Sequence, residues 1–555
     1  MRIPIALYLL ALVARLVLIL HFPDAAYPDS YYYADVARNL AAGRGFEVDF
    51  VWIFAEVGGR VPADPVLPSA SNAHWMPLAS IVQVPFLALF GHTSAVAAAL
   101  PFALIGSLAA PLTWAIARDA GSSRLVAVGA GIMVALPVLL LAFMVQPDNF
   151  SLYQPLVAGA LWLGARGLRG DARAFAIAGL LVGLATLSRN DGVLVGATLG
   201  LAFVWDRWRA WRSGGRRARA IPRWSAVACL ALFAIVIAPW IARQLAVFGQ
   251  ISPSSASGKV FFIRSIAEWN SIATPATLDW LLGQGIGPLL ASRVGGLIAA
   301  IGVFGTLAFA WILVPPLVVG TWSRRRSVWF GPFFTYAAIL FTFSALVSAV
   351  HVPGGTFIHS AVALVPHSYI LVLEGIAAAV AWMAARRPKW HAGRATRVFT
   401  GVAVGFAAVA AVAVGLGIHT GWEAQRADRR ALAAALTLAG ATPDARVMSL
   451  DAAGFNYISG HGGVVTPNDP IETIHEVATA YRIEWLVIER DNAVGALAPV
   501  LSGEARPAWI GPPVYTIPGR EGAPRAAIYP VCQGDLDTRC VVVAAVAAAA
   551  GSPAQ

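Results

Sequence analysis

Groups of polar residues interrupt this strongly apolar sequence, and they lie beside the ends of long apolar segments. Two acids stand out: Asp29 follows the first apolar segment, and Asp148 lies between the third and the fourth. Burial against an apolar wall disfavours the charged form of a carboxylate, so its pKa can rise towards the working range of a general base. We therefore interpret Asp29 and Asp148 as candidate catalytic residues.

Basic and aromatic residues accompany these acids. Arginine at a membrane–water boundary can hold a phosphate through paired hydrogen bonds. A carboxylate base together with such cations suits transfer of a group from a lipid-phosphate donor to a hydroxyl or amine, with the charge of the leaving phosphate stabilised. The candidate substrate-binding residues are Tyr32, Tyr33, Arg38, Arg189, Arg243, Lys259 and His359.

These residues also have structural interpretations. Asp29 could cap a helix that we expect over Ser30 to Ala42, and Asp148 could cap the next span. Arg189 and Arg243 could be interfacial anchors whose charged ends reach water. Lys259 could be a solvated loop residue. The sequence alone leaves both sets of interpretations open.

We assign no cofactor, although a divalent metal is possible. The three cysteines exclude a zinc site built from cysteine. His351, His359 and His367 are eight residues apart, which is neither a usual ligand spacing nor one face of a helix. Asp535-Leu536-Asp537 matches the Asp-x-Asp pattern of nucleotide-sugar enzymes, but no Rossmann pattern precedes it.

The composition indicates an α-helical polytopic membrane protein. Of its 555 residues, 58% are hydrophobic and 12% are charged, against roughly 25% charged in a soluble domain. So few charges exclude both a soluble surface and a disordered chain. About 20 apolar residues cross a bilayer, and eleven stretches qualify: 3–22, 94–117, 124–145, 150–166, 173–188, 190–206, 224–243, 293–320, 328–350, 366–385 and 397–419.

The basic residues indicate the orientation of these spans. With the N-terminus in the cytoplasm, inside connections hold 21 Lys and Arg residues, and outside connections before residue 420 hold 7. Cytoplasmic loops carry such an excess. We therefore predict a multi-pass protein of the cell membrane with its C-terminal region outside. The arginine clusters face anionic membrane lipids, and no nucleic-acid-binding pattern accompanies them.

Two domains are predicted. Residues 1–420 form the transmembrane domain, whose first outside loop, 23–77, carries interfacial helices over Ser30–Ala42 and Met76–Phe90. Residues 421–555 form an extracytoplasmic α/β domain because charges and turn residues return there. Its elements are expected at 446–450, 470–481, 483–489, 526–529 and 541–543. Cys532 and Cys540 lie on the oxidising side and are expected to pair.

The order of these groups resembles the GT-C superfamily of polytopic glycosyltransferases, on the branch with protein O-mannosyltransferases and the lipid A aminoarabinose transferase. That branch has an acid after the first span leading into a helix with tyrosines and Ala-Arg, here Asp29 with Tyr32, Tyr33, Ala37 and Arg38. The later elements correspond to Pro147-Asp148, Ser188-Arg189-Asn190-Asp191-Gly192 and Pro239-Trp240 with Arg243. In two places the sequence departs: Asp29-Ser30 replaces an Asp-Glu pair, and His359 and Pro366 occupy the late span without an arginine.

The resemblance covers roughly residues 1–420. It implies a polyprenyl-phosphate sugar donor, transfer outside the cytoplasm to a protein, lipid or glycan acceptor, and Asp29 as the base. A transporter should instead place paired charges near the bilayer midplane, whereas the polar residues here gather towards the outer face. A non-catalytic envelope assembly protein is the other alternative, and it would need Asp29 only as a cap.

The predicted topology can be tested by labelling single cysteines with a membrane-impermeant thiol reagent on intact cells. Cysteines introduced into 23–77 and 420–540 should react, because these segments are predicted to face outwards. Cysteines introduced into 206–223 should not react. Labelling of the 206–223 loop from outside would contradict the model.

Overall fold

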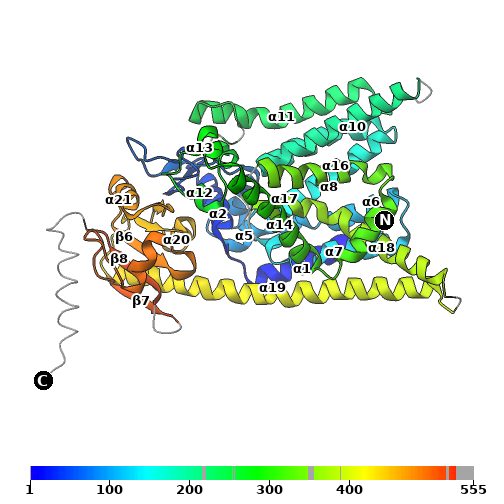
Figure 1. Ribbon diagram of the computed structural model, residues 1–555. Helices are drawn as coiled ribbons and strands as arrows, with labels where there is room; N and C mark the ends of the chain where they lie inside the picture. The colour runs from blue at the N-terminus through cyan, green and yellow to red at the C-terminus, as the bar shows by residue number, and fades with distance from the viewer. Residues whose placement is uncertain are drawn as a thin grey trace. The chain divides into compact units, whose positions relative to one another are not determined.

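The computed structural model describes residues 2–214, 220–252, 254, 257–347, 356–387, 389–519 and 524–532. It is predominantly helical and has a small sheet formed largely by C-terminal residues, which confirms the predicted fold class (Figure 1). Within the described residues, seven helical stretches are long and apolar enough to cross a membrane: Arg2–His21, Ala95–Asp119, Arg223–Phe248, Ile286–Phe309, Val328–Val347, Phe357–Ala384 and Ala392–Leu438. The predicted number of eleven stays a prediction.

The chain divides into two compact units, which we describe one at a time. Unit 1 comprises Met1–Ala25, Trp75–Ser255 and Ile286–Thr420, and unit 2 comprises Ala26–His74, Ala256–Gly285 and Gly421–Gln555. This division differs from the predicted domains, because two segments from within 1–420 group with the C-terminal region.

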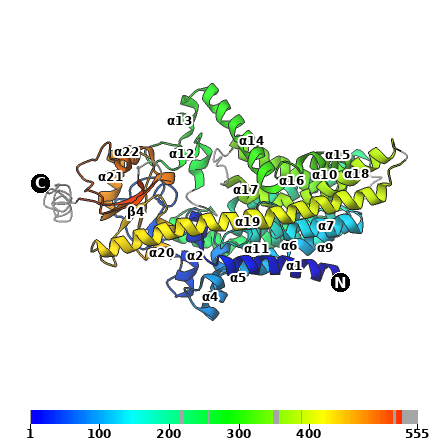
Figure 2. The ribbon, with the colours of Figure 1, turned by 90° about the horizontal axis from the view of Figure 1, so that it is seen from below.

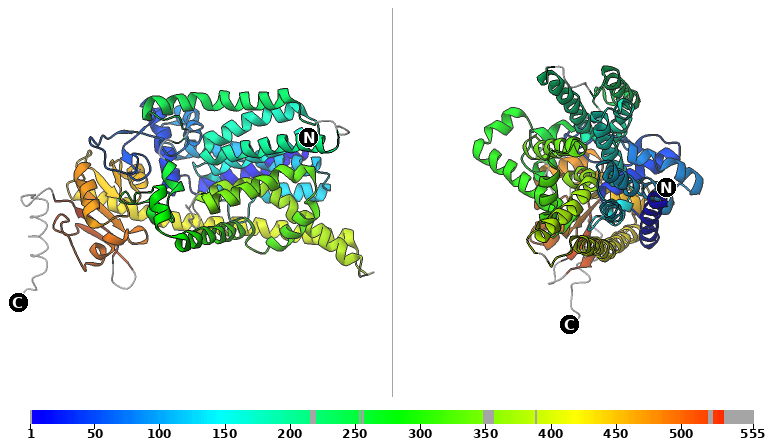
Figure 3. Two further views of the ribbon diagram at one scale, coloured as in Figure 1. Left: turned by 45° about the horizontal axis from the view of Figure 1, so that its top comes forward. Right: turned by 90° about the vertical axis from the view of Figure 1, so that its right-hand side faces the viewer.

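Unit 1 contains the apolar helices, which run side by side (Figure 2, Figure 3). They are α1 (Arg2–His21), α3 (Leu78–Ile81), α4 (Val84–Phe90), α5 (Ala95–Gly106), α6 (Ala109–Asp119), α7 (Arg124–Ala135), α8 (Phe150–Leu168), α9 (Ala172–Ser188), α10 (Val193–Arg212), α11 (Arg223–Phe248), α14 (Ile286–Phe309), α15 (Val314–Arg324), α16 (Gly331–Thr342), α17 (Thr356–Ala361), α18 (Val365–Ala384) and the first part of α19 (Ala392–Leu438). Small residues allow close approach: Gly320 of α15 faces the Leu371 carbonyl of α18 so closely that a Cβ would not fit.

Two predicted spans are wrong in extent. The span predicted at 293–320 is two helices, α14 and α15, because Ala310 and Trp311 have positive φ angles of 45° and 60° and a proline pair then begins α15. The span predicted at 124–145 is shorter, since α7 ends at Ala135, two residues before Pro137. A proline cannot continue the hydrogen bonding of a helix and so favours such breaks.

Unit 2 contains a six-stranded sheet with the order β2-β5-β4-β6-β8-β7. Its strands are β2 (Phe50–Val51), β4 (Val447–Ser449), β5 (Gly463–Val465), β6 (Trp485–Glu489), β7 (Tyr515–Pro518) and β8 (Pro524–Pro530). The first four in the sheet order pair in parallel, and β8 pairs antiparallel with β6 and β7. A separate antiparallel pair joins β1 (Glu47–Val48) and β3 (Ser69–Ala70).

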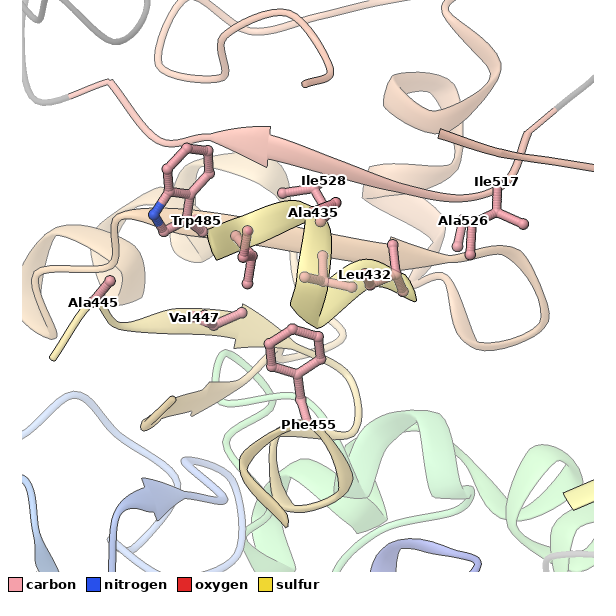
Figure 4. Packing of buried hydrophobic residues seen from close by; sticks show 11 residues of the cluster. Leu432, Ala435, Ala445, Val447, Phe455, Trp485, Ile517, Ala526 and Ile528 are labelled. Carbon is pink, nitrogen blue, oxygen red and sulfur yellow. The ribbon is translucent and has the colours of Figure 1, made fainter. Parts of the chain in front are cut away.

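Helices accompany this sheet, and its core is apolar. The helices are α2 (Pro28–Ala41), α12 (Ile266–Trp269), α13 (Leu278–Gly283), α20 (Ala452–Ser459), α21 (Ile471–Ala480) and α22 (Ala498–Ser502). Leu432, from the last part of α19, packs in one buried cluster with Val447, Phe455, Trp485 and Ile528 (Figure 4). Burial of such side chains removes apolar surface from water and stabilises the unit.

The predicted C-terminal elements are largely confirmed. The segments predicted at 446–450, 483–489 and 526–529 are β4, β6 and β8, and the helix predicted at 470–481 is α21. The strand predicted at 541–543, Cys540 and the Asp535–Asp537 pattern lie outside the described residues. Cys532 is disulfide-bonded, and Cys229 is a free thiol. The sequence did not predict that the first outside loop would contribute β2 to this sheet.

Candidate functional site

Asp148 lies buried in unit 1, in the turn between the 3-10 helix Phe143–Val145 and α8. One of its carboxylate oxygens, Oδ1, accepts the backbone N–H of Asn149. Its other oxygen, Oδ2, is 3.5 Å from Nδ1 of His359 in α17. A carboxylate removed from water costs free energy unless it is hydrogen-bonded or paired, and the backbone N–H of Asn149 supplies one such hydrogen bond.

His359 is held in place by the same turn. Its Nδ1 is 3.3 Å from Oδ1 of Asn149, and its ring lies 4.1 Å, centroid to centroid, from the ring of Phe150. The side chain is 6% exposed. The turn at 148–150 therefore determines where the His359 imidazole lies.

Arg189 is connected to this group through Asp191. Nε of Arg189 donates to Oδ1 of Asp191 at 3.1 Å, and the Ser360 hydroxyl donates to Oδ2 of the same carboxylate. Because Ser360 is the neighbour of His359 in the chain, three distant segments meet here. The structure thus brings Asp148, Arg189 and His359 into one connected group within unit 1.

Arg243, the fourth predicted residue of unit 1, lies near the end of α11. Its guanidinium lies 4.9 Å from the ring centroid of Trp240 and 5.4 Å from that of Phe248. A guanidinium over an aromatic ring is attracted by the negative face of the ring, so these two contacts help to fix the position of Arg243.

Asp29 lies in unit 2, at the second residue of α2. The expectation that Asp29 is the residue preceding a helix that starts at Ser30 is wrong, because the helix begins at Pro28 and the N-cap is Tyr27. The Ser30 hydroxyl oxygen accepts the backbone N–H groups of Ala26 and Tyr27, at 3.0 Å each. Ser30 thus organises this helix start, and Asp29 places a negative charge where the helix dipole favours one.

The tyrosines of α2 are interior residues of unit 2. The Tyr32 hydroxyl donates to Glu56 and accepts the backbone N–H of Asn72 at 2.7 Å, which fastens the first outside loop to α2. Burial, followed by the nearby Glu56 charge, raises the pKa of Tyr32. Tyr33 is 2% exposed and makes an edge contact with the Tyr32 ring.

Arg38, at the other end of α2, has two partners in unit 2. Its guanidinium lies 3.7 Å from the centroid of the Tyr457 ring, and Nη1 is 3.6 Å from Oδ1 of Asp35. Burial raises the pKa of Asp35, and Arg38 opposes that rise. The position of Arg38 is therefore determined by an aromatic ring of α20 and a buried acid.

Lys259 is held by a polar loop in unit 2. Its Nζ donates to the backbone carbonyl of Ser271, while the Asp469 carboxylate accepts N–H groups of Ile272 and Ala273 at 2.7 and 3.1 Å. Burial lowers the pKa of Lys259 to about 8, and the nearby acids Asp469 and Glu268 oppose that change. Lys259 is thus a half-buried ammonium with a defined position, unlike the solvated loop residue of the alternative interpretation.

Four residues at these sites were given no role from the sequence: Asp191, Ser360, Glu56 and Asp469. Asp191 belongs to the Ser188–Gly192 motif, so its place beside an arginine could have been inferred. Ser360, Glu56 and Asp469 act through contacts with distant parts of the chain, which single-sequence patterns do not reveal.

Comparisons with known proteins agree with the predicted resemblance. Residues 74–242 match the family model described as dolichyl-phosphate-mannose-protein mannosyltransferase. An oligosaccharyltransferase of Archaeoglobus fulgidus, solved with a tethered acceptor peptide, is similar in structure, with a TM-score of 0.55 and 13% identity over 88% of this chain and 69% of that one. ArnT of Cupriavidus metallidurans, solved with undecaprenyl phosphate, has a TM-score of 0.54 and 15% identity over 95% of this chain and 97% of that one. No curated protein matches the chain in sequence.

These findings show which fold the chain has and which proteins it resembles. At such identities the structural likeness establishes the fold, and that fold is of the GT-C type, as the sequence resemblance predicted. The family match lies within unit 1 except for its first residue, His74, and includes Asp148, Arg189 and Trp240. The chain therefore resembles glycosyltransferases of the protein mannosyltransferase and ArnT branch.

The structural role of Tyr32, as a tether between α2 and the first outside loop, can be tested separately from a role in substrate binding. Tyr32→Phe removes one buried partner from Glu56 and one from Asn72, so the free energy of unfolding should fall by about 1–3 kcal/mol. Thermal unfolding in detergent measures this. Tyr515→Phe, at a residue that is 38% exposed, is the control and should change stability by less than about 0.5 kcal/mol. Unchanged stability in Tyr32→Phe would show that the hydroxyl is not the tether described here.

Proposed function

We propose that this protein is a membrane glycosyltransferase that moves a sugar from a polyprenyl-phosphate donor to an extracytoplasmic acceptor. The observation that carries the proposal is the connected group of Asp148, His359, Ser360, Asp191 and Arg189 in a chain with a GT-C fold. A protein with a purely structural role has no need of a carboxylate–imidazole pair and an arginine–carboxylate pair at the ends of apolar helices.

The reaction that fits these groups is displacement at the anomeric carbon of the sugar. An acceptor hydroxyl or amine forms a bond to that carbon, the bond from the carbon to the phosphate oxygen breaks, and the polyprenyl phosphate leaves with the bonding electrons. Asp29 accepts the proton of the acceptor, and Asp148 orients a substrate. Positioning and stabilisation of the leaving charge supply most of the rate increase.

The cations are proposed to bind the phosphate. Arg189 follows α9 and Arg243 lies near the end of α11, and a guanidinium can form two parallel hydrogen bonds with a phosphate. Lys259 adds an ammonium donor, and His359 a ring nitrogen. Tyr32, Tyr33 and Arg38 act less directly in this proposal, since their contacts determine the shape of α2 and its surroundings.

A divalent metal is compatible with this site, although we assign none. Asp148 and His359 present a carboxylate oxygen and an imidazole nitrogen within 3.5 Å of each other, and both groups are common zinc ligands. One structure of the similar Archaeoglobus fulgidus oligosaccharyltransferase is a complex with Zn and sulfate. The transfer assay should therefore be run with added divalent cations and with a chelator.

The proposed location is the cell membrane, with several spans, the N-terminus in the cytoplasm and unit 2 outside. The several apolar helices support a multi-pass membrane protein. The excess of inside arginines supports the orientation. The acceptor lies outside the cytoplasm in this arrangement.

The central test is Asp29→Asn. Asparagine keeps the size of the side chain but cannot accept the acceptor's proton, so turnover should fall by about 10²–10⁴-fold. The assay measures release of polyprenyl phosphate from a labelled lipid-linked sugar by protein shown to be monodisperse in detergent. Asp64→Asn, at an exposed loop residue, is the matched control and should leave turnover unchanged. Wild-type turnover in Asp29→Asn would exclude Asp29 as the base.

Donor binding through Lys259 predicts a pH dependence with a defined sign. The pKa of about 8 means that the ammonium is present below pH 8 and is lost as the pH rises through that value. The donor KM of the wild type should therefore increase about tenfold between pH 7 and pH 9, since about one-tenth of a group with this pKa is still charged at pH 9. Lys259→Arg, which stays charged, should show little change. Parallel pH profiles for the two proteins would exclude a phosphate contact by Lys259.

A further inference from the structure

A groove between α1 and α7 in unit 1 has the chemistry of a lipid site. Its volume is about 550 Å³, and nearly all of its lining is apolar. The residues that line it follow one face of each helix: Ile3, Leu7 and Leu10 from α1, and Arg124, Val128 and Ile132 from α7. Among the described residues that line the groove, Arg124 is the one that carries a charge.

The two helices lie side by side, and two contacts between them show that they run in the same direction. Near the start of the contact, the Leu7 side chain of α1 packs closely on Gly131 of α7 and takes up the space that a Cβ on this glycine would need. Further along, Nη1 of Arg15 donates to the carbonyl of Ala135 at 3.3 Å. From the first contact to the second, the residue numbers increase along both helices. The N-terminal ends of α1 and α7 therefore lie at the same end of the groove.

That end of the groove is positively charged. Arg124 is the first residue of α7 and Arg2 the first of α1, and both are exposed. Neither helix has an acidic residue in its first turn. The positive ends of two helix dipoles add to the two guanidinium groups, so an anion is favoured there.

We propose that this groove binds one anionic phospholipid, with an acyl chain along α1 and α7 and the phosphate at Arg124. The occupant is a lipid rather than a protein segment because α1 is apolar and long enough to cross a membrane and α7 is a shorter apolar helix, so their exposed faces are suited to membrane lipid. The apolar part of the groove suits an acyl chain. Its cationic end complements the negative charge of a headgroup phosphate. With the orientation proposed above, the lipid belongs to the cytoplasmic leaflet.

The test measures lipid retained by the full-length protein. Protein in nanodiscs containing phosphatidylglycerol and phosphatidylcholine is transferred to mild detergent, and retained lipid is counted by native mass spectrometry. Ala6→Trp fills the groove, since Ala6 lines it, and Arg124→Gln removes the charge. The controls are Val13→Trp, at an α1 residue that is 57% exposed outside the groove lining, and Arg173→Gln, at an exposed arginine of α9.

Retention of phosphatidylglycerol should fall about tenfold in Ala6→Trp and in Arg124→Gln, and both controls should retain it at the wild-type level. Arg124→Gln decides the matter by itself if Ala6→Trp is not monodisperse. Wild-type retention in Arg124→Gln would overturn the proposal, as would equal losses in the controls. Equal retention of phosphatidylcholine by the wild type would also overturn it, because the site would then lack preference for an anionic headgroup.

Discussion

A carboxylate among apolar helices must be given hydrogen-bond donors, and unit 1 is organised around meeting that need twice. Asp148 accepts the N–H of Asn149 and lies beside the imidazole of His359, while Asp191 accepts hydrogen bonds from Arg189 and Ser360. His359 and Ser360 are adjacent in α17, so a single short helix serves both acids. The cost of leaving either carboxylate without donors is what draws three distant segments together.

Much of the fold follows from patterns that one sequence carries. Long apolar runs identify the helices, and alternating or continuous apolar residues identify strands such as β6. Breaks within apolar runs were harder to predict, because hydropathy carries no information about backbone angles. The positive φ angles that separate α14 from α15 are an example. The pairing of β2 with the C-terminal sheet could not be predicted, since a strand of two residues has no periodicity and its partner lies far along the chain.

The candidate site was predictable in part. Asp148 and Arg189 were singled out because charged groups are rare beside apolar spans, and His359 because of its place in the late span of the family resemblance. The structure connects these three. Partners such as Ser360 were missed, since serine is common and its role depends on a contact with Asp191. The start of α2 was misassigned because proline at the first helical position extends the helix by two residues, which makes Tyr27 rather than Asp29 the cap.

The pairing of β2 with β5 has a consequence for how the protein is made. About 400 residues of chain separate Phe50 from its partner Gly463, and at about 5–20 residues per second their synthesis takes about 20–80 s. During that interval the first loop is already outside in the proposed topology, but its strand has no partner. The helix that carries Asp29 likewise meets α20 only after the last third of the chain has begun to emerge. The sheet of unit 2 and the contact between α2 and α20 therefore stay incomplete until translation is nearly finished.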